Sequence, residues 1–406
     1  MRDTSLLRLA LPYRRLSIHR VRLDGPDVIL EVSVRGRARC PGCDRRRPLH
    51  DSRPSRRWRH LDFGPRRCFL EGPVRRVDCP KCGVRTERVS WASPRSGFTY
   101  AFEDLVGWLT RRMDKTSITT LVGIAWRTVG AILTRVVDRH LEPFELAKLK
   151  AISIDELSYR KGHRYVTLVT DLESGRVVWS GEGRSKETLA KFFAWAGPEV
   201  CARIQHAAID MCAAYESAIR AHLPDAELVF DRFHVQRLVS DALDETRREE
   251  WRRARQEGDG SHVKNLRYAL LKNPWNLTSR QNASLAELQV KNKRLYRAYL
   301  LKESFVDIYR SLAEPEVAKR RFGRWLAWAK RSRITAFEKV ARTIQKQLPG
   351  ILAYFRTGYT TSKSEGVNTK ARLATRVAYG FHSVDAVLAM IDLHCAGVHV
   401  PLPHLR

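Results

Sequence analysis

The stretch Ala151–Ser180, AISIDELSYRKGHRYVTLVTDLESGRVVWS, predicts three consecutive β-strands. Ala151–Ile154 is a short apolar run that ends at Asp155. Arg164–Thr170 is rich in β-branched and aromatic residues, and Arg176–Ser180 returns after a turn that contains a glycine. An ionised aspartate at the end of a buried strand is costly unless it is paired or bound to a cation. Asp155 is therefore the first candidate for a functional site.

The following segments predict two more strands, each of which also ends at an aspartate. After a helix that begins at Ser185, the strand Arg203–Ile209 leads to Asp210, and the apolar run from Leu228 leads to Asp231. The order βββαβαβ is that of an RNase H-like α/β core. In such a core the first two aspartates end adjacent central strands, so we expect their carboxylates to meet.

The composition indicates a polyanionic partner. The 406 residues include 74 Lys and Arg against 44 Asp and Glu, a formal net charge of +30, and the excess is concentrated in the first quarter of the chain. A field of this sign favours nucleic acid, whose phosphates it neutralises. An anionic membrane is the rival partner, but the sequence has no apolar run of about 18 residues and no signal-like N-terminus. We therefore expect a cytoplasmic protein without a membrane partner.

Four of the eight cysteines form two CPxC pairs, Cys40–Cys43 and Cys79–Cys82. Each pair is typical of a tight turn that points two thiolates at one tetrahedral zinc ion. Strands are predicted over 18–34, 58–63 and 66–79, around and between the pairs. A zinc ribbon with one structural zinc is favoured over four reduced core cysteines, because the core alternative leaves the proline in each pair unexplained. The other cysteines, Cys68, Cys201, Cys212 and Cys395, are expected in cores.

Three helices are predicted after a linker at residues 91–99. They cover Ala101–Met113, Ser117–Val122 and Trp126–His140, with a turn at Gly123 between the last two. Two helices joined by a short turn with a glycine are typical of a helix-turn-helix. An ordinary three-helix packing unit is the alternative, and the neighbouring zinc ribbon favours DNA reading. The exposed start of the third helix would then present Arg127, Thr128 and Gly130.

From residue 240 to 350 the strand signals end and charged helical sequence predicts an all-helical insertion into the core. A loop is predicted over 279–285. Phe322, Trp325 and Trp328 fall on one helical face. We interpret them as an aromatic core rather than a platform on which bases stack.

The segment TTSKSEGVNTKAR (360–372) places Glu365 at the start of a late helix, with polar and basic neighbours at Lys363, Asn368, Lys370 and Arg372. A lone glutamate in such surroundings is usually a surface ion-pair partner. Beside two aspartates it has another use, because phosphodiester cleavage needs two divalent cations about 3.5–4 Å apart, which three carboxylates can hold. Oxygen ligands favour magnesium or manganese over zinc.

The sequence resembles the DDE transposases of bacterial insertion sequences, specifically the insertion-sequence L-three family. The resemblance covers nearly the whole chain and rests on the CPxC knuckles with RHLD between them, the helix-turn-helix, SIDE (153–156), AAIDM (207–211), DRFHV (231–235) and SKSEGVNTKAR (362–372). It implies a catalytic, magnesium-binding triad of Asp155, Asp210 and Glu365. It also implies that Asp231 and His234 lie close to the active site, as support or as a phosphate contact. The family often has Asn-Gly before its glutamate, where this chain has Ser-Lys-Ser.

The resemblance implies hydrolysis at the ends of the element, which exposes 3′-hydroxyls that then attack target DNA. Two magnesium or manganese ions per active site are expected. The ribbon and the helix-turn-helix would bind the terminal inverted repeats, and a homodimer or larger homo-oligomer would bring two ends together. The expected DNA contacts are Arg45, Arg46, Arg47, Arg56, Arg57, Arg127, Thr128, Lys363, Asn368, Lys370 and Arg372.

Two other functions fit part of the pattern. An RNase H-like nuclease or resolvase would cut without strand transfer, and a zinc-dependent regulator would bind DNA without any catalysis. The predicted fold class is multidomain α+β. The expected domains are a zinc ribbon (1–95), a helix-turn-helix (96–148), the first part of the RNase H-like core (149–239), the helical insertion (240–350) and the last part of the core with the catalytic glutamate and a C-terminal helix (351–406).

Overall fold

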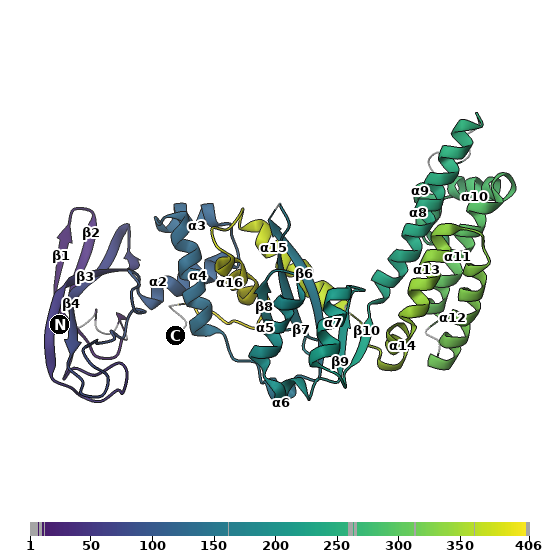
Figure 1. Ribbon diagram of the computed structural model, residues 1–406. Helices are drawn as coiled ribbons and strands as arrows, with labels where there is room; N and C mark the ends of the chain where they lie inside the picture. The colour runs from purple at the N-terminus through teal and green to yellow at the C-terminus, as the bar shows by residue number, and fades with distance from the viewer. Residues whose placement is uncertain are drawn as a thin grey trace. The chain divides into compact units, whose positions relative to one another are not determined.

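The computed structural model describes residues 7, 10–11, 13–160, 162–258, 263, 266–311, 314–360 and 362–402. The chain divides into two compact units (Figure 1). Residues 1–142 and 373–406 form the first unit, and residues 143–372 form the second. The architecture is mixed α/β with a β-rich N-terminal part, which confirms the predicted fold class.

The first unit begins with a twisted sheet that carries the cysteine pairs. Its strands follow the order β1-β2-β4-β3, with β2 and β4 parallel and the other neighbours antiparallel, and β5 pairs with β4. Trp58 and Trp91 pack edge to face in its core, with their ring centroids 5.5 Å apart. The strands are β1 (Leu16–Asp24), β2 (Asp27–Val34), β3 (Leu49–Phe63), β4 (Arg66–Val77) and β5 (Arg85–Thr86). The predicted strands in this region are confirmed.

The helix-turn-helix follows the sheet. It consists of α2 (Tyr100–Thr110), α3 (Lys115–Val122) and α4 (Trp126–His140). Gly123 ends α3 with φ +65°, a conformation that glycine adopts without strain, and the chain bends by 99° between α3 and α4. This bend lies in the range of helix-turn-helix motifs. The predicted pair is confirmed.

No described helix is by itself long and apolar enough to cross a membrane; only α3 and α4 taken together meet that test, as a bent pair.

The C-terminal helix α16 (Val384–Cys395) packs against α4. Met390 and Leu393 of α16 lie in one hydrophobic cluster with Ile132 and Leu133 of α4. A Cβ atom on Gly130 would approach the Ala386 Cβ to 3.3 Å, so Gly130 faces this helix and is buried. The suggestion that Gly130 faces DNA is therefore wrong. We expected the C-terminal helix to complete the catalytic core, but residues 373–406 group with the first unit.

The second unit contains a sheet of five strands in the order β10-β9-β6-β7-β8. The strands β6, β7 and β8 are antiparallel, and β9 and β10 add to β6 in parallel, as expected for an RNase H-like core. The strands are β6 (Ala151–Arg160), β7 (Arg164–Asp171), β8 (Val177–Glu182), β9 (His206–Ile209) and β10 (Glu227–Phe230). We expected β6 to end at Asp155, but pairing with β7 carries it on to Arg160.

The remaining elements of the second unit are helical. They are η1 (Leu146–Lys148), α5 (Lys186–Ala196), α6 (Pro198–Cys201), α7 (Ala213–His222), α8 (Arg232–Gln256), α9 (Arg267–Leu271), η2 (Pro274–Asn276), α10 (Ser279–Lys291), α11 (Lys293–Arg310), α12 (Pro315–Lys330), α13 (Thr335–Lys346), α14 (Leu348–Thr357) and α15 (Ser362–Val377), which continues past residue 372. The helices α8 to α14 share one hydrophobic core with the sheet. A Cβ atom on Gly350 would lie 2.6 Å from the Phe230 ring, so α14 approaches β10 closely.

Two local predictions for the helical region have different outcomes. The loop predicted over 279–285 is wrong, because these residues form α10. Its start is fixed by a capping box, in which Thr278 accepts from the Gln281 N–H and Gln281 accepts from the Thr278 N–H. Two of the three aromatic residues of α12 behave as core: Phe322 and Trp325 are buried, and the Trp325 indole donates to the Leu301 carbonyl over 2.8 Å, whereas Trp328 is exposed and does not belong to the core.

A buried ion-pair network stabilises the helix-turn-helix. Glu103 and Asp104 of α2 have fully buried side chains. Arg135 Nε lies 2.6 Å from Glu103 Oε1, and Arg139 donates to both carboxylates. His140 also contacts Asp104, at 2.8 Å.

Replacing Glu103 with alanine should destabilise the first unit by about 3–5 kcal/mol, because it removes the partner of charges that are already partly desolvated. Thermal or urea unfolding of the full chain would show this as a loss of stability in the transition of the first unit. Asp138→Ala is the matched control, because Asp138 lies on α4, the helix that carries Arg135 and Arg139, but is exposed. Its effect on the free energy of unfolding should stay within about 0.5 kcal/mol. Equal effects of the two substitutions would contradict a structural role for the network.

Candidate functional site

Three aspartates follow the ends of three parallel-strand segments in register. Ile154 of β6 is paired with Ile209 of β9, and Ile209 is paired with Phe230 of β10. The next residues along the chain are Asp155, Asp210 and Asp231. Adjacent strands lie about 4.8 Å apart. The register therefore brings the three carboxylates to one edge of the sheet, which agrees with the expected meeting of the first two.

Burial changes the ionisation of two of these carboxylates. It raises the pKa of Asp155, and the charge of Asp210 raises it further. A hydrogen bond of 2.6 Å from the Glu156 N–H opposes this rise. Burial likewise raises the pKa of Asp210, with a smaller contribution from Asp231 and an opposing one from His234. The negative charges thus lack compensation from the protein alone.

The third aspartate is the most deeply buried of the three. The Asp231 side chain is fully buried, and its Oδ1 accepts from the Phe233 N–H at the start of α8. His234 Nε2 lies 3.8 Å from Asp231 Oδ2, beyond hydrogen-bonding distance. Asp231 Oδ2 and Asp210 Oδ1 are buried and have no hydrogen-bond partner among the described residues. Such orphaned carboxylate oxygens are the ligands that Mg²⁺ or Mn²⁺ prefers, so this edge fits a divalent cation.

The helix α15 is fixed to β6 at two points. The hydroxyl groups of Ser153 and Ser364 are hydrogen-bonded, and the Asn368 side chain donates to Asp155 Oδ2. Ser364 and Asn368 are four residues apart, so they lie on the same face of the helix. Asn368 was expected to contact DNA, but it is buried against Asp155.

Glu365 belongs to the first turn of α15 and is exposed. At about 100° per residue, Glu365 and Arg372 lie within about 20° of each other around the helix. The charge of Arg372 acts on Asp155. Glu365 lies one residue after Ser364, which is bonded to β6, but it does not join a compact ligand cluster: within the described residues, the only group of three or more metal-ligand side chains within 4.8 Å of one another is formed by cysteines.

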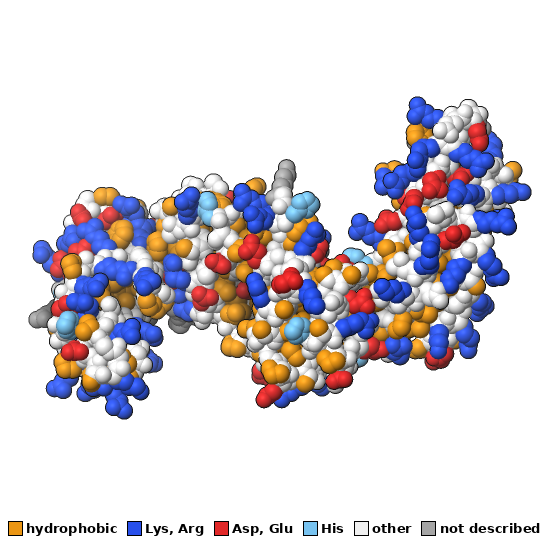
Figure 2. Space-filling model, in the orientation of Figure 1, with side chains coloured by type: hydrophobic (Ala, Val, Ile, Leu, Met, Phe, Trp, Pro, Cys, Tyr) orange, Lys and Arg blue, Asp and Glu red, His pale blue; other side chains and the backbone are white. Residues whose placement is uncertain are grey.

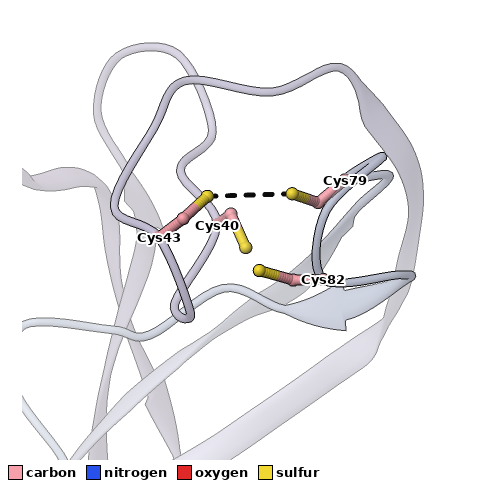
Figure 3. Close-up of side chains that lie close together, drawn as sticks. All are labelled: Cys40, Cys43, Cys79 and Cys82. Carbon is pink, nitrogen blue, oxygen red and sulfur yellow. Dashed lines mark hydrogen bonds between the residues drawn. The ribbon is translucent and has the colours of Figure 1, made fainter.

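That cluster contains Cys40, Cys43, Cys79 and Cys82, and Figure 3 shows the four sulfur atoms facing one another. Cys43 Sγ and Cys79 Sγ are 3.7 Å apart. Both CPxC turns are closed by backbone hydrogen bonds, from Asp44 to Cys40 and from Gly83 to Cys79. Although burial opposes it, hydrogen bonds from backbone N–H groups lower the pKa of Cys79 to about 6. The donor set and its convergence fit one tetrahedral zinc ion.

The residues expected to contact DNA occupy different environments. Arg45 and Arg46 are exposed, whereas Arg47 lies against the Cys43 and Cys79 sulfurs. Arg57 is ion-paired with Asp24 and Glu71. Three of the remaining side chains are exposed and two are half-buried; the Lys363 side chain lies outside the described residues. The exposed ones are Arg127, Lys370 and Arg372, and the half-buried ones are Arg56 and Thr128.

The sequence analysis did not identify the serine pair that holds α15 on β6. Ser153 lies between apolar residues of a strand, and Ser364 precedes Glu365. A buried hydroxyl needs a partner. A serine inside the apolar run Ala151–Ile154 was therefore a signal that a polar group from another element would face it.

Replacing Cys79 with serine should abolish zinc binding and unfold the ribbon, because binding of a structural metal and folding are coupled. We expect one zinc ion per wild-type chain and less than a tenth of that in the variant, measured by elemental analysis after dialysis. Cys68→Ala is the matched control, because Cys68 is buried in the same sheet but outside the cluster. Retention of zinc by Cys79→Ser would contradict the assignment.

The comparisons with known proteins agree with this geometry. Three family models match the chain: a transposase model over residues 152–391, the helix-turn-helix domain of transposase family ISL3 over 87–137, and the zinc-finger of transposase IS204/IS1001/IS1096/IS1165 over 36–90. The chain is 40% identical over 408 residues to the transposase for insertion sequence element IS1557 of Mycobacterium tuberculosis, across 94% of this chain and 91% of the relative. It is 31% identical to the transposase for insertion sequence element IS1001 of Bordetella parapertussis, across 85% and 86%. The chain therefore belongs to the transposase family ISL3.

Proposed function

We propose that this chain binds the terminal inverted repeats of its insertion sequence, cleaves the ends by metal-dependent hydrolysis and joins the exposed 3′-hydroxyls to target DNA. The observation that carries the proposal is the register-aligned row of Asp155, Asp210 and Asp231, with orphaned oxygens, beside the helix of Glu365. The names of the relatives, transposases for insertion sequence elements, support it. We also propose that the protein acts on bacterial DNA in the cytoplasm.

The carboxylates of Asp155, Asp210 and Glu365 would hold two magnesium or manganese ions, with Asp231 as a fourth acidic group beside them. When bound, two such ions align the attacking and the leaving oxygen of a phosphodiester. Burial raises the pKa values of Asp155 and Asp210. Buried carboxylates attract divalent cations more strongly than carboxylates in water do, because the surrounding dielectric constant is lower.

The other side chains position these carboxylates and the DNA. Asn368 donates to one oxygen of Asp155, and the Glu156 N–H binds the other. This fixes the orientation of the carboxylate. Arg372 and His234, whose charges act on Asp155, would contact the phosphates that flank the scissile bond.

DNA recognition would use the N-terminal end of α4, where Arg127 is exposed and forms no ion pair among the described residues. Thr128 lies beside it in the first turn, the part of a recognition helix that contacts base edges. Transposition joins two ends of one element, so we propose that a homodimer or larger assembly is the active form.

The central test uses labelled DNA with the terminal repeats, Mg²⁺ and the variant Glu365→Gln. This variant should lose cleavage and strand transfer by about a thousandfold while it keeps DNA binding, since it removes one metal ligand without a change in shape. Glu199→Gln, at an exposed glutamate of α6, is the control that should stay active.

Pre-cut ends supplied in the same assay separate the alternatives. Cleavage without joining would identify a nuclease or resolvase, and binding without either reaction would identify a DNA-binding regulator. Either result from the wild-type protein would contradict the proposed transposition chemistry.

The raised pKa of Asp155 predicts that its ionised carboxylate lowers the stability of the metal-free protein. An acid whose pKa is higher in the folded than in the unfolded protein loses stability as pH rises from about 4 through its folded pKa. At neutral pH and without metal, Asp155→Asn should therefore melt at a higher temperature than wild type. Mg²⁺ should raise the melting temperature of wild type but have a smaller effect on the variant.

Asp225→Asn is the control for this experiment, because Asp225 is exposed. It should leave both the melting temperature and the response to Mg²⁺ unchanged. A lower melting temperature for metal-free Asp155→Asn would show that the carboxylate is satisfied by protein groups alone.

A further inference from the structure

A cavity of the ribbon lies beside β3 and the segment that follows the second cysteine pair. Its volume is about 810 Å³. It opens where the pairing of β3 with β4 shifts between Arg53 and Arg56, at Pro54, a residue that cannot donate a backbone hydrogen bond to the ladder. Five arginines line it: Arg53, Arg56, Arg85, Arg88 and Arg95. We call this cavity the arginine cleft.

The arginines of the cleft have no acidic partner, unlike several arginines on other parts of the sheet. None of the five forms an ion pair with a carboxylate within the part of the chain that the structure describes. Arg56 donates to the Ser96 carbonyl and Arg85 to the Cys82 carbonyl. By contrast, five other arginines of the same sheet are paired with acids: Arg22, Arg57, Arg67, Arg75 and Arg76.

The acidic groups near the cleft are already neutralised. Glu87 also lines it, but its carboxylate binds Arg15 and Arg75. Asp51, whose ionisation Arg53 affects, is paired with Arg76. The cleft therefore has an uncompensated positive charge, and Figure 2 shows Lys and Arg side chains gathered over this N-terminal part.

The cleft also holds its cations in a defined arrangement. The Arg56 guanidinium lies over the Trp58 ring, 5.6 Å from its centroid, and Trp58 is buried. Arg85 lies three residues after Cys82, and its Nε donates to the Cys82 carbonyl over 2.8 Å, which ties the guanidinium to the second cysteine turn. All five cations are arginines, whose planar forks bind phosphate oxygens in pairs.

We infer that the arginine cleft binds the sugar–phosphate backbone of the terminal-repeat DNA, as a contact independent of base sequence. The inference rests on the proposed function for the identity of the DNA. It also revises the residues expected from the sequence, since only Arg56 belongs to both sets. Arg57 is paired with acids and Arg47 lies against the cysteine sulfurs, whereas the cleft residues form no ion pair with a carboxylate among the described residues.

The test is the salt dependence of DNA binding by the full-length protein with the double variant Arg53→Ala, Arg88→Ala. Each lost phosphate contact should reduce the slope of log Kobs against log [salt] by about 0.9, so the double variant should lose about 1.8. Terminal-repeat and scrambled duplexes should weaken in parallel. The control is Arg67→Ala, because Arg67 is on the same sheet but paired with Asp27, and its slope should not change.

Zinc content shows whether the ribbon is folded in each variant. If the alanine variant loses zinc, the pair Arg53→Lys, Arg88→Lys replaces it and should keep the wild-type slope while it weakens binding several-fold. An unchanged slope in the alanine variant, or a loss confined to the terminal-repeat duplex, would overturn the inference. These outcomes are independent of strand transfer, so failure of the catalytic proposal would be seen separately in the pre-cut assay.

Discussion

In the aspartate site at the end of β6, β9 and β10, the strand pairing that satisfies the backbone also brings together side chains whose negative charges repel one another. Hydrogen bonding in register across β6, β9 and β10 aligns Ile154, Ile209 and Phe230, and so places the aspartates that follow them at the same edge. The backbone gains its full set of hydrogen bonds only by crowding carboxylates that burial already penalises. Asn368 and the Glu156 N–H relieve part of this cost at Asp155. The rest remains as raised pKa values and orphaned oxygens, a condition that a divalent cation would relieve.

The helix α15 is subject to two sets of packing requirements. Its first turns meet β6 through Ser364 and Asn368, in the second unit. Its last turns supply Ala374 and Ala378 to the hydrophobic cluster that contains the helix-turn-helix. Small alanines permit close packing at one end, and hydrogen-bonding side chains fix the other. Glu365 lies between Ser364 and Asn368 in sequence. The polar contacts of these two residues with β6, and not the exposed charges around Glu365, therefore fix its place on the helix.

The sequence was sufficient for those features that local patterns determine. Paired CPxC turns, alternating strands and the break at Gly123 each have a local physical cause, and the ribbon, the sheet and the helix-turn-helix follow from them. Contacts between distant segments were beyond such reasoning. Neither the burial of Asn368 against Asp155 nor the packing of α16 on α4 leaves a periodic signal. The polar stretch 279–285 was misread because its composition suits a loop, whereas the capping box at Thr278 starts a helix there.

Net charge alone does not say which cations act on DNA. Some of the 74 Lys and Arg are arginines whose charge is cancelled within a few ångströms by Asp or Glu. Such exposed pairs contribute little to stability, and beyond a Debye length of about 10 Å their opposite charges give almost no field. The field that a phosphate backbone meets therefore comes from the cations that have no acidic partner. In the ribbon five of these cations line one cleft, and this local concentration carries more functional information than the total.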